Sequence, residues 1–448
     1  MSASVSISLV IFLWTATIIT HVATTVAKSQ SSSLEQELKA LKETGWWWPW
    51  GSEKNTSSPC ELRGIVCNDF GSVKEIKIND VWIDSNYQVD CTLCNFNFSS
   101  FPNLVQLNLA RVGLRGSIPP EIGSVSKLTH LKLLGNYLSG IIPSTLGLLT
   151  SLTHLDLHSN QIKGTILVEV YNLKNLTTLH LGSNTLFGPI SSKIGKLKNL
   201  VSLNLSDNIL SGSIPSTIGH LTNIQTLSLS WNQFSGSIPS KIGRMNKLVS
   251  LDLGVNNLVG TIPPSFGQLI NLCHLDIHSN QLNGSIKPAI GDLKLLILLD
   301  LSSNKISGMI PNELTQLTQL QNLSLASNRL SGSLPPDMKD LLSLFVLDLS
   351  YNMLSGPFPT QIAHCYRLKQ LYLNENHFNG SIPPQVANLF RLTTINLSHN
   401  LFSGEIPSDL GSPLPKPFHE ISLWQLMNQE IYLEDKNVEK CNDRMETR

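Results

Sequence analysis

The stretch LTHLDLHSNQIKGTI, residues 152–166, holds the repeating pattern on which the fold depends. Leucines stand 8, 5 and 3 positions before Asn160, and an apolar residue, Gly and Ile follow it at plus 2, plus 4 and plus 6. The pattern recurs every 24 residues, around Asn136, Asn160, Asn184, Asn208, Asn232, Asn256, Asn280, Asn304, Asn328, Asn352, Asn376 and Asn400. Such a period predicts a solenoid of stacked turns rather than a globule.

Each repeated position has a physical role. The Leu-x-x-Leu-x-Leu segment alternates like a short strand with one side in the core, so stacked turns predict a parallel sheet. A buried Asn amide satisfies backbone groups of its own and the neighbouring turn, which predicts a structural Asn ladder. Gly at plus 4 and Pro at plus 7 disfavour helix, so the outer side is expected to be extended or 3₁₀.

The array has a definite extent. An earlier turn, from Leu104 to Pro119, has Val112 in place of Asn, which makes 13 regular turns ending near Gly411. An irregular first turn precedes them, because 31 residues separate Val73 from Leu104. We therefore predict one continuous solenoid over residues 71–411, since each turn of a repeat array packs only on its neighbours.

The amino-acid composition fits a protein with a binding surface and does not indicate a highly charged partner. Lys plus Arg and Asp plus Glu number 32 each, and charged residues make up 14% of the 448 residues, against roughly 25% in an average soluble protein. This balance does not indicate a nucleic-acid partner.

The N-terminal region predicts secretion followed by a cap. An apolar stretch, residues 5–19, precedes small residues up to Ala27, so residues 1–27 are expected to be a signal peptide. Residues 28–70 are expected to cap the solenoid, with apolar side chains Leu34, Leu38, Leu41, Trp46, Trp47, Trp48 and Trp50. Cys60 and Cys67, close together in a secreted chain, predict a disulfide.

A family resemblance follows from these motifs. The segment Pro59-Cys60-Glu61-Leu62-Arg63-Gly64-Ile65-Val66-Cys67, a strand at Val73 to Ile78 and turns such as Leu-Ser-Gly-Ser-Ile-Pro at 210–215 resemble the ectodomains of plant leucine-rich-repeat receptor-like kinases. Leu62 stands where that family usually has Trp. The resemblance implies a β-rich α/β-type solenoid, a right-handed superhelix with a curved parallel sheet on its concave face. It also implies binding of a peptide or glycan ligand, or of a leucine-rich-repeat co-receptor.

The concave face supplies candidate ligand contacts. Strand positions that point away from the core, on 13 strands about 4.8 Å apart, make a face of about 60 Å, which suits an extended ligand. Histidine would make binding sensitive to pH, and aromatic side chains are favoured contact residues. The candidates are His130, Lys132, His154, Asp156, His158, His180, Trp231, His274, Asp276, His278, Tyr351 and Tyr372.

Two His-x-Asp-x-His triplets, at 154–158 and 274–278, raise the alternative of a metal site. We expect no metal, because residues two apart on a strand are about 6.6 Å from each other and closure would need neighbouring strands. Asp at this repeat position also occurs without His neighbours, at Asp252, Asp300 and Asp348. No kinase, nucleotide-binding or serine-hydrolase motif is present, so neither a cofactor nor an enzymatic activity is expected.

The remaining cysteines and the glycosylation sequons complete the predictions for individual residues. A local disulfide between Cys91 and Cys94 is a possibility, whereas Cys273 and Cys365 are expected to be unpaired. Sequons in a secreted chain predict glycans at some of Asn55, Asn97, Asn175, Asn204, Asn283, Asn322, Asn379 and Asn396.

The sequence after the last turn departs from the family. Residues 412–448 carry no paired-Cys cap, no membrane span and no kinase motif, and are expected to be a partly disordered tail. Ile421, Trp424, Met427 and Ile431 have helical spacing.

Three functions remain open from the sequence. The leading hypothesis is the extracellular ligand-recognition domain of a receptor-like kinase, here in a truncated form without kinase. It would be in the apoplast as this chain, or at the plasma membrane in a longer product. The alternative is a secreted defence protein that inhibits a microbial cell-wall hydrolase, and a metal-dependent enzyme is a distant third.

Overall fold

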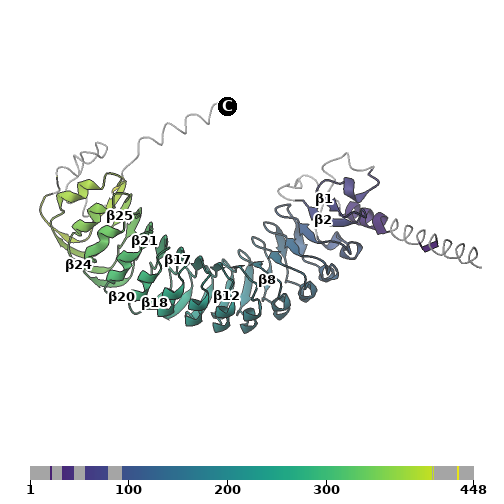
Figure 1. The fold of residues 1–448 in the computed structure, drawn as a ribbon, viewed down its shortest axis with the longest axis horizontal. Coiled ribbons are helices and arrows are strands. Elements are labelled where there is room, and N and C mark those ends of the chain that lie inside the picture. The colour runs from purple at the N-terminus through teal and green to yellow at the C-terminus, as the bar shows by residue number, and fades with distance from the viewer. Residues whose placement is uncertain are drawn as a thin grey trace, which may run out of the picture. The chain divides into compact units, whose positions relative to one another are not determined.

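The computed structural model describes residues 21–22, 33–44, 56–78, 93–405, 407 and 431–432. It divides into two compact units, Met1–Thr185 and Leu186–Arg448, which are described one at a time. Figure 1 colours the chain by residue number, from purple at the N-terminus to yellow at the C-terminus. Nearly all of the predicted signal peptide, the tryptophans at 46–50 and most of residues 412–448 lie outside the described residues.

The first unit contains a sheet of short strands stacked in chain order. β1 pairs antiparallel with β2, and each later strand pairs parallel with the one before it. The strands are β1 (Ile65–Cys67), β2 (Val73–Lys77), β3 (Gln106–Asn108), β5 (His130–Lys132), β7 (His154–Asp156) and β9 (Thr178–His180).

The main strands of the second unit also pair in parallel register. At the end of this sheet, β29 (Ile431–Tyr432) pairs antiparallel with β27. Ile431 is therefore in a strand, and the helical spacing that we read across 421–431 was wrong at that residue. The parallel strands are β11 (Ser202–Asn204), β13 (Thr226–Ser228), β15 (Ser250–Asp252), β17 (His274–Asp276), β19 (Leu298–Asp300), β21 (Asn322–Ser324), β23 (Val346–Asp348), β25 (Gln370–Tyr372) and β27 (Thr394–Asn396).

The core of each turn comes from the repeated leucines. Leu251, in the middle of β15, is fully buried and stands in register with Leu227 and Leu275 of the adjacent strands. Full burial of one such side chain contributes about 1.5–3 kcal/mol. The polar residues on either side of Leu251 face away from this core, so the same alternation that fills the interior builds an outward face.

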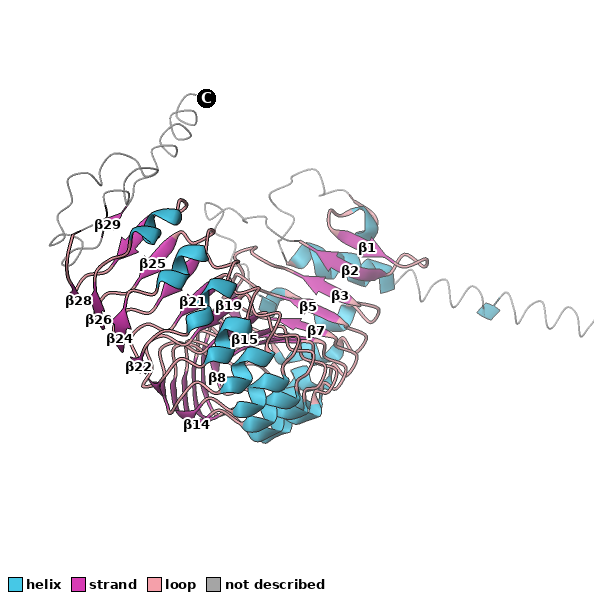
Figure 2. Cartoon of the chain, turned by 60° about the vertical axis from the view of Figure 1, so that its left-hand side comes forward, coloured by secondary structure: helices cyan, strands magenta, loops and turns pink. Residues whose placement is uncertain are grey.

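The outer side of the turns is 3₁₀ helix and short strand, which confirms the expected architecture. Figure 2 shows the helices and the main-sheet strands on opposite sides of the turns. Pro215 illustrates the local cause: with φ −69° it sits at the N-cap of η10, the position just before the helix. The 3₁₀ helices are η6 (Pro120–Ser124), η7 (Ser144–Leu148), η8 (Val168–Asn172), η9 (Ser192–Lys196), η10 (Ser216–His220), η11 (Ser240–Arg244), η12 (Pro264–Gln268), η13 (Pro288–Asp292), η14 (Asn312–Gln316), η15 (Pro336–Asp340), η16 (Thr360–His364) and η17 (Pro384–Asn388), with η3 (Pro59–Glu61), η4 (Leu93–Asn95) and η5 (Phe98–Ser100) before them.

From β3 to β25, a short outer strand lies between each main strand and the following 3₁₀ helix. In the second unit, for example, β12 pairs parallel with β14, and β14 with β16. These strands are β4 (Arg115–Ser117), β6 (Tyr137–Ser139), β8 (Lys163–Gly164), β10 (Thr185–Gly188), β12 (Ile209–Ser213), β14 (Gln233–Ser237), β16 (Asn257–Thr261), β18 (Gln281–Asn283), β20 (Ser307–Gly308), β22 (Arg329–Gly332), β24 (Met353–Pro357), β26 (His377–Gly380) and β28 (Leu401–Phe402).

The repeated Asn side chains join successive turns. Asn280 Nδ2 donates to the carbonyl oxygens of Leu253, Ile277 and His278, and its Oδ1 accepts from the backbone N–H of Leu258. The residue just before each Asn has a positive φ, as at Val255 (φ 51°). This bend was not predicted from the sequence, because non-glycine residues seldom adopt the left-handed region.

The N-terminal cap is held by a buried carboxylate as well as by apolar packing. In the helix over residues 33–43, Leu41 is fully buried and Leu38 is half-buried. Glu37 is also fully buried; its Oε1 accepts from Ser72 Oγ at 2.5 Å and its Oε2 from the N–H of Val73 at 2.8 Å. Burial raises the pKa of Glu37, although both hydrogen bonds oppose the shift.

The cysteines divide into one bridge and three free thiols within the described parts of the chain. Cys60 and Cys67 form a disulfide beside the buried Leu62. Cys94 is free and exposed in η4, between Leu93 and Phe96, both of which are buried. This contradicts the suggested bridge to Cys91, which itself lies outside the described residues. Cys273 and Cys365 are free, and burial raises the pKa of Cys365 to about 12.

Candidate ligand-binding face

The outward side of the main sheet, which we call the sheet face, consists of the residues 6 and 4 positions before each Asn. Parallel register places residues of the same repeat position side by side, as for Asp156 and His180 on β7 and β9. All predicted contact residues lie on the sheet face or in the bend that follows it. They fall into one group in the first unit, from His130 to His180, and one in the second, from Trp231 to Tyr372.

His130 and His154 form a stacked pair in the first unit. Their ring centroids are 4.2 Å apart and their planes differ by 12°. Each Nδ1 contacts the hydroxyl of the preceding threonine, Thr129 or Thr153, at 2.8 and 2.9 Å. Burial lowers the pKa of both histidines, helped by the charge of Lys132. These two imidazoles therefore stay neutral at a lower pH than a free histidine, which limits their use as sensors of mild acid.

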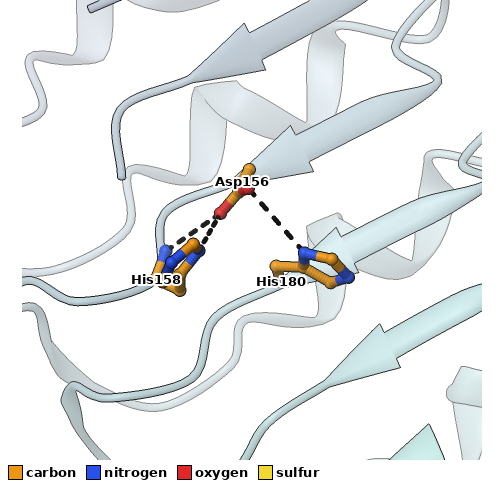
Figure 3. A group of neighbouring side chains, drawn as sticks. All are labelled: Asp156, His158 and His180. Carbon is orange, nitrogen blue, oxygen red and sulfur yellow. Dashed lines mark hydrogen bonds and ion pairs between the residues drawn. The ribbon is translucent and has the colours of Figure 1, made fainter. Parts of the chain in front are cut away.

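Asp156 lies between His158, a member of the triplet that the sequence suggested, and His180 of the next strand (Figure 3). Its Oδ1 is 2.7 Å from His158 Nδ1, and its Oδ2 is 3.7 Å from His180 Nδ1 on the next strand. Burial disfavours ionisation of Asp156, but the hydrogen bonds from His158 and His180 outweigh it, so the pKa of Asp156 lies far below its usual range. His154 does not join this cluster, because it stacks on His130.

The second triplet forms a different cluster. His278 Nδ1 is 2.5 Å from Asp276 Oδ1, and Asp300 lies beside Asp276 in register on β19. Burial disfavours the charged imidazole, but the Asp276, Asp300 and Asp252 carboxylates outweigh it and raise the pKa of His278. His274 is not part of the group of ligand-like atoms formed by Asp276, His278 and Asp300.

We expect His278 to titrate above the ordinary histidine pKa of 6.5. A raised folded-state pKa means that its contribution to stability is complete below the unfolded pKa and is lost as pH rises through the folded value. NMR titration of the imidazole Cε1–H measures this. Asp276→Asn should lower the pKa of His278, whereas Asp292→Asn, on η13 at the outer side of the turn, should leave it unchanged. An equal pKa in wild type and Asp276→Asn would contradict the assignment.

The carboxylates four positions before Asn have a local structural role that the sequence did not reveal. Oδ1 of Asp252, Asp300 and Asp348 accepts the backbone N–H of the residue two positions later, at 3.1, 2.9 and 3.0 Å. Asn204 and Asn396 make the same bond. A short side chain with an acceptor oxygen stabilises such a bend, which explains why Asp recurs at this position.

Aromatic side chains are exposed at the bends of the second unit. Trp231, after β13, is 60% exposed, and Tyr351, after β23, is 55% exposed. Tyr372 is half-buried on β25, in register with Asp348.

An exposed apolar row on the flank of the last turns was not predicted. Leu342, Tyr366 and Phe390 are each about half exposed and recur every 24 residues, ten positions before the Asn. The rings of Tyr366 and Phe390 stack, with centroids 6.5 Å apart. The signal was present in the sequence, because this position is polar or charged in most other turns.

The sequons differ in accessibility. Asn396 is buried and bonded to Ser398, so a glycan there is not compatible with the folded turn, and Asn204 is half-buried. Asn55 lies outside the described residues. The exposed candidates are Asn97, Asn175, Asn283, Asn322 and Asn379.

Sequence comparisons identify the repeat. One model described as "Leucine rich repeat" matches residues 174–234, and a second of the same description matches nine segments from 127–149 to 391–413. Together they cover more than half of the chain. The chain belongs to the leucine-rich-repeat family.

Relatives within this family include plant receptors. Over 80 residues the chain is 38% identical to the leucine-rich repeat receptor-like serine/threonine-protein kinase RGI4 of Arabidopsis thaliana, a match that covers 18% of this chain and 7% of that protein. The resemblance to plant receptor-like kinase ectodomains is thereby confirmed, although the chain spans only a small part of the curated relative.

Solved structures give the same result over a longer span. The PEPR1–AtPEP1 structure is 30% identical with a TM-score of 0.72, covering 85% of this chain and 57% of that one. The Arabidopsis receptor kinase HAESA ectodomain, solved with an IDA peptide hormone, is 32% identical with a TM-score of 0.64, covering 85% and 60%. No helix in the described part of the chain is long and apolar enough to cross a membrane.

Proposed function

We propose that this leucine-rich-repeat chain is an extracellular recognition domain that binds an extended peptide on the sheet face of its second unit. It acts by binding rather than catalysis. Two of the solved structures that it resembles are described as plant receptors with a bound ligand: the peptide hormone receptor RGFR1 in complex with RGF2, and HAESA with an IDA peptide hormone. A further HAESA structure contains the co-receptor SERK1 in addition to the peptide. The same likeness supports an extracellular location, because the HAESA structure is of a receptor ectodomain.

The observation that carries the proposal is the spacing of two exposed aromatic side chains. Trp231 and Tyr351 follow β13 and β23, which are five strand intervals apart in continuous parallel register. At about 4.8 Å per interval this separation is about 24 Å, the length of roughly seven extended residues. Aromatic side chains are the commonest hot spots of protein interfaces, so the two rings suit an extended peptide better than a small molecule.

The sheet face between these rings has a definite charge. Asp252, Asp276, Asp300 and Asp348 lie in one register row, interrupted by Ser324. A peptide with basic or ammonium groups between two apolar anchors complements this row.

Selection from a phage-displayed library of random linear peptides, followed by affinity measurement, tests the proposal. Trp231→Ala should weaken the selected peptides by about 30-fold or more, the loss of a hot-spot side chain. Phe187→Ala is the matched control, since Phe187 is an exposed aromatic on the outer strand β10. Failure to select any peptide, or equal loss in both variants, would contradict the proposal. The alternative, inhibition of a cell-wall hydrolase, is addressed separately by a polygalacturonase assay with the purified chain.

A further inference from the structure

We propose that Asp156, His158 and His180 form a binding site for a divalent transition-metal ion such as Zn²⁺. The site lies in the first unit, and the proposal is independent of peptide binding by the second. Two imidazoles and one carboxylate are a ligand set that zinc adopts in proteins, leaving a fourth position for water or for an anionic group of a ligand. The sequence predicts no metal, because residues two apart on one strand need neighbouring strands to close a site; here the neighbouring strand β9 places His180 beside Asp156.

The ligand atoms are already close to coordination geometry. His158 Nδ1 is 2.7 Å from Asp156 Oδ1, His180 Nδ1 is 3.7 Å from Asp156 Oδ2, and the ligand atoms of all three residues lie within 4.8 Å of one another. Ligand atoms in a tetrahedral zinc site, with bonds of about 2.0–2.1 Å, lie roughly 3.3 Å apart. The two separations of 2.7 and 3.7 Å lie on either side of this value, so an ion would require the side chains to rotate from the positions seen here.

The backbone holds these residues in place. Asp156 and His180 end adjacent strands and are register partners. The N–H of Leu157 donates to the carbonyl of His180 at 2.8 Å, which continues the ladder beyond the strand ends. Asp156 Oδ1 accepts the backbone N–H of His158 at 3.2 Å, which orients the carboxylate and leaves Oδ2 for an ion. Ligands placed on rigid strands and oriented by such a bond favour metal binding.

Access and charge are also compatible with an ion. The side chains of Asp156, His158 and His180 are 14%, 33% and 27% exposed, so the cluster is partly desolvated but open to solvent. Lys132 is the register partner of Asp156 on the other side, and its charge opposes a cation. Replacing Lys132 with Gln should therefore tighten metal binding.

The second cluster differs in its ligands. Asp276, His278 and Asp300 offer one imidazole and two carboxylates, a harder set that is less suited to zinc. This cluster supplies an internal comparison, because its register and local bends are the same as those of the first.

Isothermal titration of the purified full chain with ZnCl₂, and visible absorption with CoCl₂, test the site. We expect one Zn²⁺ per chain, with His158→Ala and His180→Ala each weakening binding by more than about 10-fold, because the loss of a ligand should exceed the effect of losing an outer-shell partner. Asp156→Asn preserves the oxygen that accepts the His158 N–H but removes the charge, so it should weaken binding without unfolding the turn.

His154→Ala and His278→Ala are matched controls that should bind Zn²⁺ as the wild type does. Thermal unfolding of each variant without metal identifies any that fail to fold. If the histidine variants fail to fold, Zn²⁺ binding by Asp156→Asn decides whether the site exists. Absence of Zn²⁺ binding, binding that survives Asp156→Asn together with either histidine variant, or binding lost in His154→Ala or His278→Ala would overturn the proposal.

Discussion

Replacing Asn256 with Ala is expected to destabilise the second unit by about 3–5 kcal/mol, because several buried backbone groups lose their partners at once. Asn256 is 8% exposed. Its Oδ1 accepts from the N–H of Phe234 at 2.9 Å, and its Nδ2 donates to the carbonyls of Leu229, Leu253 and Gly254 at 3.0, 3.2 and 3.1 Å. Alanine supplies none of these bonds and leaves a small void between two turns.

Asn257→Ala is the matched control. Asn257 is the next residue in the chain and is exposed on β16, so its loss should change stability by less than about 0.5 kcal/mol. Because repeat arrays open locally, hydrogen exchange of the amides from Leu229 to Asn280 should be measured alongside urea unfolding. Equal stability of the two variants would show that the Asn ladder does not hold the turns together.

Replacing Glu37 with Ala is expected to detach the N-terminal cap, at a cost of about 2–4 kcal/mol, since hydrogen bonds to a charged group contribute about 1.5–3 kcal/mol each. The change leaves Ser72 Oγ without this acceptor and exposes the start of β2, because the N–H of Val73 also loses its partner. Hydrogen exchange should become faster in residues 33–43 and at Val73.

Glu35→Ala separates this effect from helix propensity. Glu35 lies in the same helix and is exposed, so its replacement by Ala should leave exchange at Val73 unchanged. If Glu35→Ala and Glu37→Ala accelerate exchange equally, the buried carboxylate is not what holds the cap.

The sequence did not predict which side chains pair with one another in the candidate sites. In the segment around 154–158 we grouped residues by their separation along one strand, and the structure regroups them across strands. Residues two apart on a strand are about 6.6 Å from each other, whereas neighbouring strands are about 4.8 Å apart. His154 therefore pairs with His130, and Asp156 with His180. Residues at the same repeat position lie side by side on adjacent turns. Their interactions therefore depend on which side chains those turns carry.

The burial of Glu37 was also not predicted from the sequence. Leu34, Leu38 and Leu41 predicted a cap helix by their spacing, but no local rule predicts a fully buried glutamate. Its burial is stable because the backbone N–H of Val73 at the start of β2 and the hydroxyl of Ser72 both donate to its carboxylate. Cys94 is a similar case, since a CxxC spacing predicts proximity but not the outward position of this thiol in η4.

The 24-residue period was sufficient to predict the solenoid, its parallel sheet and its 3₁₀ outer side, because each turn buries its apolar residues only against turns of the same pattern. Alternation within each turn likewise identified the outward face. The pairings on that face and the closure of its end required the folded chain, because both depend on contacts between residues about 24 or more positions apart. Side-chain clusters such as Asp156 with His180 arise from that stacking, and periodicity alone does not specify them.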